Sequence, residues 1–164
     1  MTTKEIRVML QDIYLLGDAI ENKLNGMFDR ENSEIRGTLE NDMLRYLIHL
    51  AAVDGKVTYE EWKVIEEFTD VNLAEAVDYT AFNEECAIYC QDYYGMMDEN
   101  EVPVSVQIFK LAEDVVFGDQ TGSMVQKLID TYEKLGNEFR ERVEDKRFFI
   151  LERHQCFIDR LKAV

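Results

Sequence analysis

Apolar residues recur every three or four positions along almost the whole chain, which is the spacing of one face of an α-helix. Strict alternation of apolar and polar residues, the pattern of a half-buried strand, is hard to find. The first stripe predicts a helix of about 25 residues that ends near Gly26. A second helix is expected over about 34–53, and its end is the most apolar part, which predicts deep burial there.

The later stripes predict five more helices, which lie at about 59–68, 72–94, 108–115, 125–139 and 150–161. No linker is long enough to divide the chain. We therefore predict an all-α, single-domain bundle of about seven helices over residues 1–164. The rhythm of helix, polar turn and helix around Leu135–Lys146 echoes that around Asp54. Two weakly related helical halves are therefore expected, the second over about 103–164.

The segment Asp54–Trp62 has the clearest helix junction in the sequence. Gly55 can adopt a positive φ and end the preceding helix. Thr58 and Glu61 have the spacing of a capping box, so the next helix is expected to begin at Tyr59. Asp54 fits this explanation least, because a carboxylate at a helix C-terminus opposes the helix dipole. Two interpretations of Asp54 stay open, namely turn chemistry and a site for a divalent cation or a partner.

An EF-hand loop does not explain this junction. Such a loop needs oxygen ligands at its first, third and fifth positions, and with Asp54 as the fifth the other two are Leu50 and Ala52. A cation held between Asp54 and Glu61 would require both carboxylates to face one another. Neutralisation of the two carboxylates by a Lys or Arg side chain would exclude that site.

Composition narrows the class of protein. The 34 acidic and 18 basic residues give a formal net charge of −16, which argues against nucleic-acid binding because phosphate contacts need basic patches. A decoy that imitates nucleic acid with regular rows of carboxylates is a separate alternative. The N-terminus has no signal-peptide pattern, and the longest runs without charged residues, Tyr46–Val53 and Val102–Phe109, are too short to span a membrane. A cytoplasmic protein is therefore expected.

Charge and aromatic residues are both concentrated in the middle of the chain. From Val64 to Phe109 there are eleven acidic residues and no Lys or Arg. Tyrosine and phenylalanine are enriched at protein interfaces, although in a bundle they more often belong to the core and its rim. The predicted partner-binding residues are Tyr79, Phe82, Tyr89, Tyr93 and Tyr94.

The cysteines and histidines give no strong catalytic pattern. Three cysteines make no disulfide framework, and a zinc site is an alternative that would combine Cys86, Cys90, His154 and Cys156. Two buried thiols and a core histidine explain the same residues more simply. Motifs for a di-iron bundle, a catalytic nucleophile and a phosphate-binding loop are missing from the sequence, so we do not expect an enzyme.

The segment Tyr46–Phe68, with its Ala-Ala-Val-Asp-Gly junction followed by Val57, a helix cap and paired glutamates, resembles the tellurite-resistance TerB-like family, also described as a DjlA N-terminal-like helical domain. The resemblance implies an all-α fold of two related halves and a link to chemical stress responses. A metal-binding role proposed for the family's acidic residues points to Asp54 and Glu61, and less directly to Glu60. The second half departs from the pattern, since Glu144-Asp145-Lys146 stands where a second Asp-Gly junction is expected.

Two functions are therefore expected from the sequence. The first is a non-catalytic TerB-like binding module with a divalent cation as its only candidate cofactor. The second is a structural or adaptor protein that meets a protein partner through its acidic, aromatic-rich middle region. Neither function involves nucleic acid or a transmembrane segment, and the sequence does not specify an oligomeric state.

Overall fold

The computed structural model describes residues 1–28, 35–70, 97–116, 123–143 and 146–164, and all regular structure in these ranges is helical. Its α-helices are α1 (Thr3–Phe28), α2 (Ile35–Ala51), α3 (Tyr59–Thr69), α5 (Val104–Leu111), α6 (Ser123–Arg142) and α7 (Arg147–Lys162). A short 3-10 helix, η1 (Ala52–Asp54), extends α2, and a π-helical turn, η3 (Ala112–Val116), extends α5.

The predicted all-α class is confirmed, while the predicted helix count is not. The described ranges contain six α-helices, whereas about seven were expected. The helix expected at 72–94 lies outside the described residues. The helices at the start, at Tyr59 and in the second half fall close to the positions that their apolar stripes predict.

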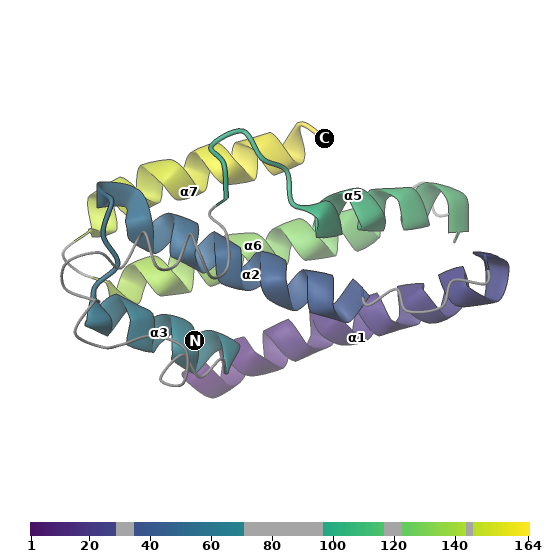
Figure 1. Ribbon diagram of the computed structural model, residues 1–164, viewed down its shortest axis with the longest axis horizontal. Coiled ribbons are helices and arrows are strands. Elements are labelled where there is room, and N and C mark those ends of the chain that lie inside the picture. Colours follow the sequence, from purple (N-terminus) through teal and green to yellow (C-terminus); the bar gives the residue numbers. More distant parts are fainter. Residues whose placement is uncertain (29–34, 71–96, 117–122, 144–145) are drawn as a thin grey trace.

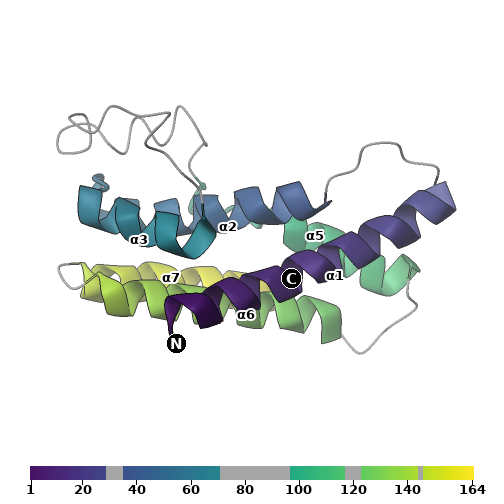
Figure 2. The same ribbon diagram turned by 90° about the horizontal axis from the view of Figure 1, so that it is seen from below.

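The helices are arranged in two layers. Figure 2 shows α2 and α3 in one layer and α6 and α7 in the other, with α1 crossing obliquely between them. The most extensive helix contacts are those of α6 with α7 and of α1 with α2, while α5 packs against α6 and α2. Figure 1 shows α7 lying along the side of the bundle next to the end of α2. This arrangement brings the C-terminal helix beside the conspicuous Asp54 turn.

One apolar core joins the layers. It takes the expected stripe of α1, including Ile6 and Ile13, and the stripe of α6, including Tyr132 and Phe139. At Gly136 α6 lies close to α7, because an added Cβ would overlap the His154 ring. A larger residue at that position therefore requires this side chain to move.

The junction after α2 has the predicted local structure. Gly55 has φ 84°, in the left-handed region that glycine favours, and it follows η1 directly. The Glu61 amide donates to Thr58 Oγ1 at 3.2 Å, and the Thr58 amide donates to Glu61 Oε2 at 3.3 Å. This reciprocal pair is a capping box, and α3 begins at Tyr59 as predicted.

Among the described residues, no helix combines the length and the apolar character that crossing a bilayer requires.

Candidate functional site

The predicted carboxylate pair is brought together in the structure, but a lysine lies between its members. The Lys146 Nζ atom is 2.7 Å from Asp54 Oδ1 and 2.8 Å from Glu61 Oε1. It also donates to the backbone carbonyls of Ala51 at 3.0 Å and Lys56 at 2.6 Å. We call these groups the Lys146 cluster. Its ammonium has three protons and is surrounded by acceptors on every side.

The burial of the Lys146 cluster gives its ionic contacts a structural role. The side chain of Glu61 is 2% exposed and that of Lys146 is 5% exposed. Burial alone would raise the pKa of Asp54, but hydrogen bonds from Lys146 and the Lys56 amide, with the charge of Lys146, hold that pKa below its usual value. Asp54 is thus an ionised partner of the Lys146 ammonium.

The Lys146 cluster gives Asp54 and Glu61 a cationic partner within the protein. The ammonium occupies the position between the carboxylates where a divalent cation was expected, and it supplies the neutralising charge. Glu60 is exposed in the first turn of α3 and is not among the partners of Lys146. A carboxylate there is explained by its favourable interaction with the helix N-terminus.

Of the alternative zinc ligands, the structure describes His154 and Cys156, and their burial differs. His154 is buried, and its Nδ1 atom is hydrogen-bonded to the Tyr46 hydroxyl, as expected for a core histidine. Cys156 is exposed with a free thiol. Cys86 and Cys90 lie outside the described residues. Within the described part of the chain, no three His, Cys, Asp or Glu residues are grouped so that they could hold a metal ion.

The predicted aromatic partner surface cannot be placed, because Tyr79, Phe82, Tyr89, Tyr93 and Tyr94 all lie outside the described residues. The structure instead shows a different candidate surface on α7. A cavity of about 420 Å³ lies between the end of α2 and the outer side of α7, and the loop before α5 closes one end. We call it the α2–α7 groove.

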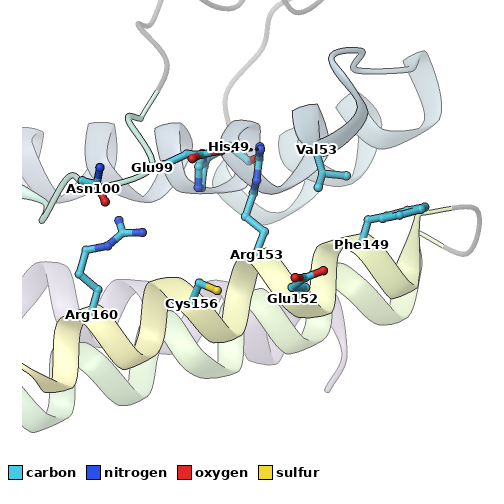
Figure 3. Close-up of a pocket in the computed structure, with 9 residues that line it drawn as sticks. All are labelled: His49, Val53, Glu99, Asn100, Phe149, Glu152, Arg153, Cys156 and Arg160. Carbon is cyan, nitrogen blue, oxygen red and sulfur yellow. Dashed lines mark hydrogen bonds and ion pairs between the residues drawn. The ribbon is translucent and has the colours of Figure 1, made fainter.

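Side chains of α7 form one wall of the α2–α7 groove. Figure 3 shows Arg153, Cys156 and Arg160 rising from α7 toward His49 and the loop with Glu99. Positions 149, 153, 156 and 160 repeat at helical spacing, so they follow one line along α7. The groove therefore runs parallel to the helix axis.

The two arginines are tied to the opposite wall. Arg153 Nη1 donates to the His49 carbonyl at 2.8 Å, and its Nη2 lies 3.8 Å from Glu99 Oε1. Arg160 Nη1 donates to the Glu101 carbonyl at 2.8 Å. Arg45 also binds Glu101, with Nη2 at 2.9 Å from Oε2. These contacts fix the loop before α5 as the end of the groove.

His49 forms the buried floor beside these arginines. The residue is 2% exposed, and its Nδ1 atom has no hydrogen-bond partner among the described residues. Burial lowers the pKa of His49 to about 4, and the charges of Arg153 and Arg160 act in the same direction. The imidazole is therefore neutral at pH 7.

An exposed aromatic pair adjoins the groove. Phe148 is 75% exposed and Phe149, which lines the groove, is 58% exposed. The two rings contact each other edge to face, with centroids 5.9 Å apart. On the opposite side of the same helix Ile150 and Phe157 are completely buried. Large aromatic side chains that remain this exposed in a folded helix mark interaction surfaces more often than single exposed aliphatic residues do.

A second cavity, of about 390 Å³, lies among α1, α2 and the end of α3. Its arginines are already engaged by the protein itself. Arg36 donates to Asp18 at 2.8 Å and to Glu40 at 3.2 Å, and Arg7 donates to the Glu67 carbonyl at 2.6 Å. This cavity therefore offers a ligand fewer unpaired charged groups than the α2–α7 groove does.

No motif in the sequence marks Lys146 or the exposed aromatic pair. Lys146 stands only in the segment Glu144-Asp145-Lys146, which departs from the expected second junction. Phe148 and Phe149 stand beside the stripe that predicts the buried face of the last helix, and their positions off that stripe were the available signal.

In comparisons with known proteins, no family model, curated protein or solved structure matches the chain.

Proposed function

We propose that the protein is a non-catalytic helical binding module that docks a segment of a partner protein along the α2–α7 groove. The observation that carries this proposal is the exposed pair Phe148 and Phe149, of which Phe149 lines the α2–α7 groove. Aromatic anchors beside polar groups are typical of protein interfaces, in which few residues supply most of the binding energy.

The shape and charge of the groove favour a polypeptide as the occupant. Its lining extends from Phe149 to Arg160 along α7 (Figure 3). Helix α7 has four basic and two acidic residues, in a chain whose net charge is −16. It therefore offers a partner both apolar area and charges of each sign, which is the composition of an interface rim around an aromatic anchor.

The proposal does not include catalysis. Cys156 is the one nucleophile that lines this groove, and no hydrogen bond joins it to His49 among the described contacts. His49 is too buried to meet a substrate without displacement of its surroundings. An activated nucleophile needs a base within hydrogen-bond reach, and this pair does not provide that geometry.

TerB-like membership remains part of the proposal. It is supported by the Asp-Gly junction, the positive φ of Gly55 and the capping box of α3. A cation function at that junction is not proposed, because Lys146 neutralises the carboxylates.

The test uses a displayed library of random twelve-residue peptides, selected on the purified protein. Synthetic versions of the enriched peptides are then titrated by fluorescence anisotropy against wild type and Phe148→Ser/Phe149→Ser. We expect the double variant to lose binding. The matched control is Val8→Ser/Leu15→Ser, which removes two apolar side chains that are each 53% exposed on α1 and should bind like wild type. Peptides that bind equally to all three proteins would contradict the proposal.

A further inference from the structure

The α2–α7 groove carries two charges that the fold does not pair with a side chain. Glu152 has no hydrogen bond or ion pair among the described residues, although it lines the groove near Phe149. Arg160, at the other end, donates to the Glu101 carbonyl and lies over the Phe157 ring, with 5.9 Å between Cζ and the ring centroid. No carboxylate in the described part of the chain lies within ion-pair distance of it. A negative charge and a positive charge are thus available at opposite ends.

Arg153 lies between these two residues and already has partners within the protein. Arg153 is held by the His49 carbonyl and by Glu99, so its charge is balanced locally. The net pattern presented to a ligand is therefore acidic at the Phe149 end and basic at the Arg160 end. This pattern is directional, and a ligand of uniform charge would be attracted at one end and repelled at the other.

The spacing of the two charges matches an extended chain. Glu152 and Arg160 are eight residues apart on α7, which corresponds to roughly 12 Å along the helix axis. An extended segment covers that distance with about four residues, at roughly 3.3–3.6 Å each. A single amino acid or a small inorganic anion cannot reach both ends at once.

The lining of the groove suits a polypeptide backbone. The Asn100 side chain lines the groove and offers both a donor and an acceptor. It can satisfy a backbone amide or carbonyl without adding charge. Phe149, at the acidic end, supplies apolar area for a neighbouring side chain.

We infer that the groove selects an extended partner segment with a basic side chain at its Phe149 end and an acidic side chain at its Arg160 end, about four residues apart. The inference rests on the proposed function, because it specifies the segment that the module docks. The charge order fixes the direction in which the segment lies, and a segment of opposite order meets like charges at both ends.

The experiment repeats the peptide selection on Glu152→Lys/Arg160→Glu, in which the two charges are exchanged. We expect peptides selected on wild type to carry the basic-to-acidic order, and peptides selected on the exchanged variant to carry the reverse. Each set should bind the other protein roughly tenfold more weakly, the size expected when two partly exposed ion pairs become repulsive. The matched control is Glu133→Lys/Lys162→Glu, which exchanges charges that are 4.0 Å apart and do not line the groove.

The outcomes separate this inference from the proposed function. Peptides that require Phe148 and Phe149 but show no charge order overturn the inference and leave the docking surface in place. Acidic peptides that need Arg160 and ignore Glu152 also overturn it, since they indicate a simple anion site. Binding that does not depend on the phenylalanines overturns both. If the exchanged variant does not fold, as judged by its circular dichroism, Glu152→Gln/Arg160→Gln replaces it and should reduce the discrimination between the two peptide orders.

Discussion

The Lys146 cluster and the α2–α7 groove both bring charged side chains from the last part of the chain close to the end of α2, but they are organised in opposite ways. In the Lys146 cluster the ammonium and both carboxylates find partners inside the protein. In the groove Glu152 and Arg160 face a cavity and are not paired with each other or with another side chain in the described residues.

The difference shows how to distinguish a structural charge set from a binding site. A buried charge must be paired where it lies, because leaving it unpaired costs several kcal/mol. A charge at the edge of an open cavity keeps water as its partner and can exchange that water for a ligand. Sequence motifs point to residues of the Lys146 cluster, whereas the proposed function rests on the α2–α7 groove.

The largest effect on stability is expected from replacing Lys146, the central residue of the Lys146 cluster. Lys146→Met removes the ammonium that neutralises the buried carboxylate of Glu61, so the free energy of unfolding should fall by about 3–5 kcal/mol. Urea denaturation followed by circular dichroism measures this change. Lys146→Met/Glu61→Gln, which removes both charges, should recover much of the loss. A single variant as stable as wild type would show that the Lys146 cluster is not required for the fold.

The next effect concerns pH, since each histidine is held neutral by the fold. Burial lowers the pKa of His49 and of His154 to about 4, from 6.5 in the unfolded chain. The unfolded state therefore binds more protons, and stability present above pH 6.5 is lost as the pH falls toward 4. At pH 5 the loss should be about 2 kcal/mol per histidine.

Urea denaturation at several pH values between 7 and 4 measures this dependence. In His49→Gln the slope of stability against pH should be roughly halved, whatever the absolute stability of the variant. Asp54 contributes in a separate, more acidic window, because its pKa is lowered and its ion pair is lost only as the carboxylate protonates. A flat profile between pH 6.5 and 5 would mean that the histidines remain accessible to protons in the folded state.

These examples also show what the sequence could and could not predict. The capping box, the positive φ of Gly55 and the start of α3 depend on residues within a few positions, so local patterns were sufficient. The contact of Lys146 with Glu61 joins residues 85 positions apart, and no local pattern encodes it. The all-α class followed from the apolar period.

The site was less predictable for a related reason. The stripe of Ile150, His154 and Phe157 indicates which side of the last helix is buried, and the structure confirms that side. It does not indicate what lies opposite the remaining face. In the structure, Arg153 and Arg160 lie against the end of α2 and the loop before α5. This contact depends on how whole helices pack, which the sequence of α7 alone does not specify.

A smaller effect is expected at the exposed edge of the Lys146 cluster. Asp54 is 46% exposed, so Asp54→Asn should lower the free energy of unfolding by less than about 1 kcal/mol. Calorimetric titration with calcium, magnesium, manganese and zinc should show no saturable binding that the variant loses. Saturable binding by wild type that disappears in Asp54→Asn would restore the cation site and require Lys146 to move away from the carboxylates.

The smallest effect on stability is expected at the proposed docking surface. Phe148→Ser/Phe149→Ser removes two exposed rings, so the free energy of unfolding should change by no more than about 0.5 kcal/mol per site. The matched control on the same helix is Phe157→Ala, whose ring is completely buried and stacks on Tyr46 with centroids 4.2 Å apart. That control should lose about 3–5 kcal/mol. Urea denaturation of the two variants measures the contrast.

A large loss of stability in the double variant would mean that the aromatic pair belongs to the core, and its exposure could then no longer support a docking surface. Unchanged stability together with lost peptide binding separates folding from recognition along one helix.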